Sequence, residues 1–566
     1  MKMIYRYICA LAMLAAGAAA SAQNLDPTVV VDRAYEGKLM EVHKPALVMA
    51  VPDTVMRFDL DFDYSVFDSP YKGTYEFNPH LLSMKPSAPA DNAGKFYLRA
   101  GAGYQLYPEL DVLWSPAFKK AEDNFRLDVY GRHRSYFGNY CGLYADDENV
   151  IRAGDGTWYG YDMESNAGVD LSYDWEKGGI GLDVAYYGLH QKNRGYNAVD
   201  AAFDLSVQDA SEIMYDMSAD YRYAFDSSPL GHRVGETNFD FDFSIGKGLK
   251  ENSAFRVDLG VDLAGYKGYV EDAAADLCLG AHYLYNKGIL QADLGAKVAK
   301  SITDTANRAF VVAAKDQIIY PDVTVKLNVF PKFMSVFAKA TGGSKVISYS
   351  SLLDHNHYAN ISDTEFWDMG IEVERINASA GIDGRIGPNF SYTLHGGYVN
   401  YAAGMLDAVY MTFILYTVDG IYSGVEYAPY QKTFAAFDWM WRSDSFTSVG
   451  NITYSNAFGD VFGDAFGSAS FALKPAALTG NMSFEYNYKR RIFAGINADF
   501  STARKGGEHS FTIPGYVDLG VSAEYVTSRD LSFWIKGGNL LGMTIHRYPA
   551  YAVKSPYFTA GFSVKF

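Results

Sequence analysis

Polar and apolar residues alternate one by one along much of the chain, and this pattern constrains the fold more than any other feature. The stretch NFDFDFSIG (238–246) places three phenylalanines and an isoleucine on one side of an extended chain, with asparagine, aspartate and serine on the other. The stretches NMSFEYNYK (481–489) and YVDLGVSAEYV (516–526) repeat this alternation. A period of two is typical of β-strands that have one apolar and one polar face. The sequence therefore predicts an all-β protein.

The apolar faces need either a protein core or the hydrocarbon of a membrane. Hydrophobic residues make up 49% of the chain and aromatic residues 16%, with 45 tyrosines and 36 phenylalanines. We find no run of about 18 apolar residues after the first 22 positions, so the sequence contains no candidate membrane-spanning helix there. Long strands with aromatic girdles at the membrane interfaces suit this composition. The alternative is a large soluble β protein.

The connections between the alternating segments also fall into two kinds. Short charged turns are expected at 174–179, 285–288 and 488–491, and longer polar loops at 137–157, 193–210 and 346–369. Short periplasmic turns and long outward loops are typical of bacterial outer-membrane barrels. This asymmetry favours a membrane barrel over a soluble sandwich.

A sheet that crosses lipid must close on itself, because unpaired backbone groups are costly in hydrocarbon. The last strand should therefore pair with the first strand, which we expect near residues 95–106. A crossing strand needs about 9–11 residues. The alternating segments of residues 95–566 predict a transmembrane antiparallel β-barrel of about 22 strands, within a range of roughly 14 to 24.

The final stretch, SPYFTAGFSVKF (555–566), alternates like a strand and ends on a phenylalanine. Phe558, Phe562 and Phe566 fall on its apolar face, with Phe566 expected in the aromatic belt at the membrane interface. We predict that these three residues form a C-terminal assembly signal for the barrel assembly machinery and contact outer-membrane lipid.

The N-terminal part of the chain differs from the barrel region. Residues 1–22 contain a basic start, an apolar stretch and small residues before a cut after Ala22, which predicts a secretory signal peptide. Residues 23–94 are rich in proline, which predicts an extended arm in the periplasm or the barrel lumen. Within this arm, Asp59, Asp61 and Asp63 alternate along a short strand and are interpreted as a solvated face rather than a calcium site.

The end of the chain, LSFWIKGGNLLGMTIHRYPAYAVKSPYFTAGFSVKF (531–566), resembles the end of outer-membrane TonB-dependent receptor barrels. The matching pieces are Phe533, the Asn539-Leu540-Leu541 turn, Tyr548-Pro549 and Phe566. The segment 318–343 is similar to a strand, periplasmic turn and strand of the same barrels. The resemblance covers residues 95–566 and implies an outer-membrane receptor or transport barrel from a Gram-negative bacterium.

Receptors of that family carry a plug domain ahead of the barrel, whereas residues 23–94 are too short for such a domain. The resemblance therefore implies a barrel without its plug. A barrel of this size has a wide lumen that is normally filled. Inward-folded loops, the 23–94 arm or a separate protein are the candidates for filling it.

Candidate sites for chemistry are few. Arg126, Arg132 and Arg134 alternate on one face of a predicted strand, where they could attract carboxylates or phosphates into the lumen or pair with lumenal Asp and Glu. His355 and His357 lie in LLDHNHYAN, which we interpret as a polar loop tip rather than a metal clip.

The sequence shows no nucleophile, Walker or zinc-protease motif, so we expect no catalytic, cofactor or metal site and no enzyme. A formal charge of −17 disfavours nucleic acid as a partner. We expect solute transport or ligand reception at the outer membrane. The alternative is a structural scaffold for periplasmic or surface-exposed partner proteins.

Overall fold

The computed structural model describes most of the chain from residue 95 onward. The described ranges are 95–104, 108–116, 124–145, 151–192, 194–207, 213–227, 233–250, 252–269, 271–303, 318–330, 333–359, 369–414, 417–462, 470–506, 511–548, 551–553 and 555–566. The predicted signal peptide and arm, with Asp59, Asp61 and Asp63, lie outside these ranges.

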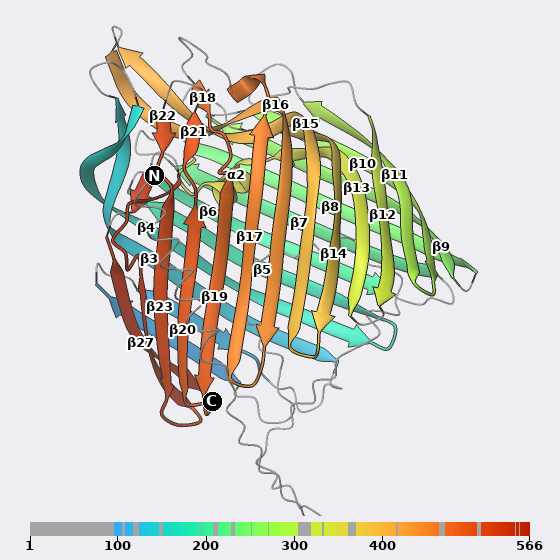
Figure 1. The fold of residues 1–566 in the computed structure, drawn as a ribbon, viewed down its shortest axis with the longest axis horizontal. Coiled ribbons are helices and arrows are strands. Elements are labelled where there is room, and N and C mark those ends of the chain that lie inside the picture. The colour runs from blue at the N-terminus through green and yellow to red at the C-terminus, as the bar shows by residue number, and fades with distance from the viewer. Residues whose placement is uncertain are drawn as a thin grey trace, which may run out of the picture. The chain divides into compact units, whose positions relative to one another are not determined.

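The described residues form a closed antiparallel barrel of 22 strands, as the sequence predicted (Figure 1). Its strands are β1 (Phe96–Gly103), β2 (Glu109–Trp114), β3 (Phe125–Ala145), β4 (Ile151–Trp175), β5 (Gly178–Gln191), β6 (Arg194–Val207), β7 (Ile213–Ser227), β8 (Arg233–Lys250), β9 (Ser253–Gly268), β10 (Asp272–Lys287), β11 (Leu290–Thr303), β12 (Ile319–Phe330), β13 (Met334–Ile347), β14 (Gly370–Ile386), β15 (Phe390–Ile414), β16 (Thr417–Arg442), β17 (Phe446–Phe458), β19 (Leu478–Tyr488), β20 (Ile492–Ser501), β23 (Tyr516–Val526), β24 (Leu531–Gly538) and β27 (Tyr557–Lys565).

Short elements occupy the connections between these strands. They are α2 (Tyr349–His355), η2 (Asp460–Phe462), β18 (Ser470–Ala472), β21 (Arg504–Gly506), β22 (Phe511–Ile513), β25 (Ile545–Tyr548) and β26 (Tyr551–Val553). Strand β18 pairs with residues 408–410 of β15, and β26 pairs with β3.

The predicted closure between the first and last strands is confirmed. Strand β1 pairs antiparallel with β27 from Tyr97 opposite Lys565 to Gly103 opposite Thr559. In Figure 1 the red strand β27 accordingly lies beside the blue N-terminal strands. This pairing leaves the barrel wall without an open edge, as a sheet in lipid requires.

Each strand has one face toward the outside of the barrel and one toward its interior. On β10, Leu277 and Leu279 are exposed on the outer face, whereas the alternate residues Asp276 and His282 are buried in the interior. Phe558, Phe562 and Phe566 are likewise exposed on the outer face of the closing strand pair. The apolar faces therefore form the outer surface that an outer-membrane barrel presents to lipid.

The two ends of the barrel differ, and we name them by their connections. The turn end carries Phe96 and Lys565 together with the tight turns predicted at 174–179, 285–288 and 488–491, all of which the structure contains. The loop end carries the longer connections, including the one that follows β13. The segment 318–343 also forms the predicted strand, turn and strand, as β12 and the beginning of β13.

Two predicted loops are wrong. Residues 194–207 form β6, whose polar residues Asn197, Asp200 and Asp204 made a membrane strand look like a loop. Residues 137–157 continue β3 and β4, which pair as far as Ala145 opposite Ile151. Asp200 and Asp204 are tolerated in a strand because they lie on the interior face, with β7 beside them.

Candidate functional site in the barrel interior

The predicted arginine row lies on β3 among carboxylates. Arg134 Nη2 donates to both carboxylate oxygens of Asp111 at 2.9 Å and lies 3.4 Å from Glu109. Arg132 Nε lies 3.4 Å from Asp111, and Arg126 Nε lies 3.3 Å from Asp128. The arginines thus pair with carboxylates of β2 and β3, one of the two interpretations that the sequence left open. A role in attracting solutes stays a prediction.

The interior wall formed by β7 to β10 carries a row of directly opposed aspartates. The strand register sets Asp220 opposite Asp240, Asp240 opposite Asp262, and Asp262 opposite Asp276. Asp276 accepts hydrogen bonds from the hydroxyls of Ser301 and Ser344, each at 2.6 Å. The row therefore makes this wall strongly acidic.

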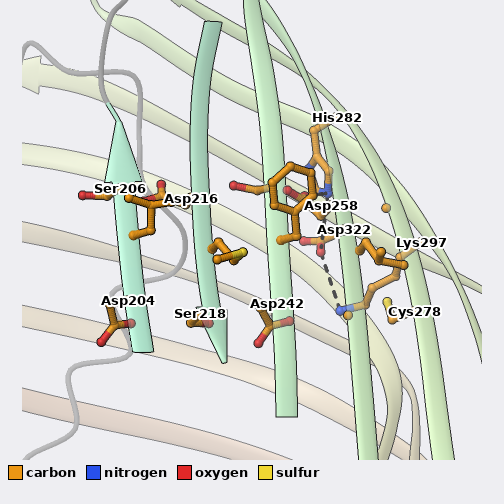
Figure 2. Close-up of a pocket in the computed structure, with 17 residues that line it drawn as sticks. Asp204, Ser206, Asp216, Ser218, Asp242, Asp258, Cys278, His282, Lys297 and Asp322 are labelled. Carbon is orange, nitrogen blue, oxygen red and sulfur yellow. Dashed lines mark ion pairs between the residues drawn. The ribbon is translucent and has the colours of Figure 1, made fainter. Parts of the chain in front are cut away.

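Next to this row, toward the turn end, the wall is hollowed into a cavity of about 600 Å³. Figure 2 shows how its lining residues come from neighbouring strands of the wall; the polar ones that it labels are Asp204, Ser206, Asp216, Ser218, Asp242, Asp258, Cys278, His282, Lys297 and Asp322. Gly260 and Gly280 lie in the same wall, and their missing side chains help to leave the space open. Carboxylates and hydroxyls make up most of the polar part of this lining.

His282 is held in place at the edge of this cavity. Its Nδ1 lies 2.7 Å from Asp293, and its Nε2 lies 3.1 Å from Asp258. Lys297 Nζ lies 3.6 Å from Asp322, and this ion pair is drawn in Figure 2. These contacts fix the two basic groups of the cavity against its walls.

The connection after β13 folds into the barrel instead of outward. We call residues 348–359 the inward segment; it contains α2, whose first turn is capped by the Ser348 hydroxyl accepting from the Ser351 amide. Tyr349, Leu352 and Leu353 are almost completely buried. They belong to one cluster of buried residues that also includes Tyr196 of β6 and Tyr266 of β9. The segment is therefore packed against the barrel wall.

A buried polar network joins the inward segment to β6 through β9. The backbone amide of Ser350 donates to Glu236 at 3.1 Å, and that of Tyr349 donates to the Tyr266 hydroxyl at 2.8 Å. Glu236 also accepts from the hydroxyls of Tyr266 at 3.0 Å and Tyr196 at 3.2 Å. These interactions satisfy polar groups that would be costly to bury alone.

Arg194 is the charged centre of the same attachment. Its guanidinium is 3% exposed and lies 4.0 Å from Asp226, which is 1% exposed. It donates to the backbone carbonyls of His357 and Ala359 and, at 3.4 Å, to the Tyr349 hydroxyl. One side chain of β6 thus holds both ends of the inward segment.

The other side of the inward segment reaches distant strands. His355 Nε2 lies 2.7 Å from Asp407 of β15, and Asn356 donates to the Ser423 hydroxyl of β16 at 2.9 Å. The hydrogen bond that His355 donates to the Asp407 carboxylate raises the pKa of His355. Because β15 and β16 do not neighbour β6 to β9 in the sheet, the segment must cross the interior of the barrel.

The contacts of the inward segment place it near the loop end. Arg194 begins β6 and Asp226 lies near the end of β7, both at the loop end, whereas Asp204 and Asp216 of the cavity lie toward the turn end of the same strands. The segment therefore lies between the loop end of the barrel and the cavity. This is one of the three ways of filling the lumen that the sequence left open.

Comparisons with solved structures agree with this architecture. The siderophore receptor PirA from Acinetobacter baumannii matches with a TM-score of 0.55 at 10% identity, over 83% of this chain and 80% of that one. The FrpB iron transporter from Neisseria meningitidis matches with a TM-score of 0.59 at 10% identity, over 84% and 83%. The barrel has the fold of these receptors. The closed wall and apolar outer surface of the barrel agree with the predicted location in the outer membrane.

Sequence comparisons add nothing further: no protein-family model matches the chain, and no curated protein does either. Among the described helices, none combines the length and apolar character needed to span a membrane. Within the described ranges, no group of three or more His, Cys, Asp and Glu side chains is arranged to hold a metal ion. His355 and His357 instead contact two different carboxylates, Asp407 and Asp162.

The sequence did not reveal the residues that hold the inward segment. Arg194 lies in a stretch that the sequence predicts to be a loop, and Glu236 comes from a strand far away in the chain. The available signal was the small apolar run Leu352-Leu353 within a polar connection, which indicates a loop that packs against something.

Proposed function

We propose that the chain is an outer-membrane transport barrel in which the inward segment serves as the lumenal barrier. The observation that carries this proposal is the position of residues 348–359 across the interior, between the loop-end opening and the acidic cavity. A polar, charged interior that is narrowed by the chain itself suits the passage or capture of a water-soluble solute. The solved structures with this fold are described as receptors and a transporter, which supports transport over catalysis.

In this proposal the barrel works without a separate plug domain. The inward segment supplies an occluding element from within the barrel sequence, so residues 23–94 are not required for that role. Its attachment to both β6–β9 and β15–β16 supports a stable barrier, because polar networks of this kind order the groups that form them.

Solute flux through the purified protein tests the proposal. The full chain is reconstituted into liposomes beside a variant in which residues 349–358 are replaced by a glycine-serine linker of equal length. We expect slow entry of small sugars and amino acids through the wild type and faster entry through the variant. A second variant, in which residues 304–313 between β11 and β12 are replaced by a glycine-serine linker of the same length, controls for general disturbance of the barrel.

The scaffold alternative gives a different result in the same experiment. A scaffold would pass no solute in either form and would co-purify with stoichiometric partners from native membranes in mild detergent. Absence of flux from both forms, with such partners present, would therefore replace transport by assembly as the proposed function.

A further inference from the structure

Basic side chains collect at the turn end of a chain whose formal charge is −17. We call them the basic ring; its exposed members are Lys247, Lys287, Arg385, Arg442, Lys489, Arg490, Arg491, Arg529 and Lys565. The same described turns also carry Asp174, Glu176, Asp444 and Asp530, so basic groups outnumber acidic ones there. The described turns of this end therefore carry a net positive charge, although the whole chain is acidic.

The basic ring lies just beyond an outward-facing level of aromatic side chains. Trp441 precedes Arg442 on β16 and Tyr488 precedes Lys489 after β19, both strands run toward the turn end, and both rings are exposed. Exposed aromatic girdles mark the membrane interface of a transmembrane barrel. Basic groups one residue beyond that level can reach the headgroups of the adjoining leaflet.

The turn between β19 and β20 has charged residues at two positions whose left-handed backbone conformation disfavours residues other than glycine. Lys489 and Arg490 have φ angles of 52° and 56°, in the left-handed region, and the Arg491 amide donates to the Tyr488 carbonyl at 3.0 Å. Hairpin turns of this geometry favour Asn-Gly. The turns at Gly288 and Gly387 place glycine at their left-handed positions. Strained non-glycine residues at a turn are a reason to look for function.

We propose that the basic ring, with the Lys489-Arg490-Arg491 turn as its densest part, binds the phosphates of anionic phospholipid headgroups. Short turns of outer-membrane barrels face the periplasm, so the leaflet concerned is the periplasmic one. Lysine and arginine near a membrane surface are attracted to anionic lipid, and arginine matches phosphate geometry. The binding anchors the turn end at a fixed depth and does not depend on which solute the barrel carries.

The test measures the heat-induced unfolding midpoint of the full chain in vesicles. Vesicles of phosphatidylcholine alone are compared with vesicles that also contain phosphatidylglycerol, for the wild type and for Lys489→Asn combined with Arg490→Gly. Phosphatidylglycerol should raise the wild-type midpoint, and the variant should lose most of this rise. Titration should show about thirtyfold weaker binding of phosphatidylglycerol by the variant, since two charges are removed.

The variant Lys489→Asn with Arg490→Gly, called the Asn-Gly variant, should still fold, because Asn-Gly suits the geometry of this turn better than the native residues do. In pure phosphatidylcholine its midpoint should equal or exceed that of the wild type, which separates loss of lipid binding from loss of folding. Arg385→Gln with Arg442→Gln removes two ring charges without changing a strained position and should also reduce the rise. Lys267→Gln with Lys300→Gln, exposed near the loop end, is the matched control and should retain it.

Three results would overturn the proposal. The Asn-Gly variant could retain the full rise with phosphatidylglycerol. The loop-end control could lose as much of the rise as the ring variants. Inorganic phosphate added to phosphatidylcholine vesicles could reproduce the rise, which would indicate general anion binding rather than a lipid site.

Discussion

The rings of Phe96 and Phe566 stack with 5.5 Å between their centroids, and the two residues exchange both backbone hydrogen bonds, at 2.8 and 3.0 Å. This contact joins the first residue of β1 to the last residue of the chain. It extends the β1–β27 pairing to the turn-end rim of the barrel. The final phenylalanine therefore takes part in closing the barrel, in addition to any role as an assembly signal.

Removing the last ring should weaken this closure. Phe566→Ser loses an aromatic pair that contributes about 1 kcal/mol beyond its burial, and deletion of Phe566 also removes two backbone hydrogen bonds. We expect less heat-modifiable barrel in outer-membrane fractions on gel electrophoresis, with the deletion worse than the substitution. Lys565→Gln keeps the pairing and should assemble normally. Normal yields from the deletion would contradict a role for Phe566 in closure or assembly.

The paired strands β1 and β27 should not tolerate a side chain at Gly101. Trp534 lies inside the barrel, 2% exposed, with its ring across Gly101 and Gly561 and with Arg99 4.2 Å above it. A Cβ on Gly101 would overlap this ring and lie 2.9 Å from the Ala560 carbonyl oxygen.

Gly101→Ala should therefore destabilise the barrel by about 1–3 kcal/mol, as overpacking does. The unfolding midpoint in denaturant measures the effect. Gly181→Ala, also on the interior face, would place its Cβ 3.7 Å from Asp204 and should be nearly neutral. Equal midpoints for the two variants would contradict the packing described for Trp534.

Arg194 should control the attachment of the inward segment. Arg194→Met leaves the Asp226 carboxylate buried beside an apolar side chain, and breaking a buried ion pair in this way costs about 3–5 kcal/mol. We expect faster hydrogen exchange at the amides of residues 349–358, with the barrel strands still protected. Adding Asp226→Asn should restore part of the protection. Unchanged exchange in Arg194→Met would show that the network does not hold the segment.

The attachment through His355 should depend on pH. Asp407 of β15 faces His355, with Arg504 and Glu372 nearby, and the pKa of His355 is raised above its ordinary value. A raised pKa means that the contact stabilises the segment fully below about pH 6.5, the unfolded value, and that this stabilisation is lost as pH rises through the folded pKa.

Amide exchange in residues 349–358 should therefore accelerate as pH rises through this range, after correction for the intrinsic exchange rate. His355→Gln should flatten this dependence, while His133→Gln on the outer face of β3 should leave it unchanged. A wild-type profile that matches that of His355→Gln would contradict the ionic contact.

Much of the barrel could be predicted from the sequence because its strands obey a single local rule. Alternation of polar and apolar residues specifies each strand by itself, and the cost of open edges in lipid then requires closure between residues near 95 and 566. The rule failed at 194–207, where Asp200 and Asp204 face the interior and give a polar appearance to a membrane strand.

The interior could not be predicted in the same way because its contacts join distant parts of the chain. Arg194, Glu236 and Asp407 meet the inward segment only after the barrel has closed. Trp534 packs inside the barrel because Gly101 and Gly561, on two other strands, leave room for its ring. Local sequence does not contain these relationships.

The central claim is that residues 348–359 stand between the loop-end opening and the interior cavity, and Cys278 in the cavity wall reports on it directly. In a Cys141→Ser background, intact cells are treated with a membrane-impermeant maleimide and the rate of labelling at Cys278 is measured. We predict slow labelling with the native inward segment and much faster labelling when residues 349–358 are replaced by a glycine-serine linker. Fast and equal labelling of both proteins would contradict the claim.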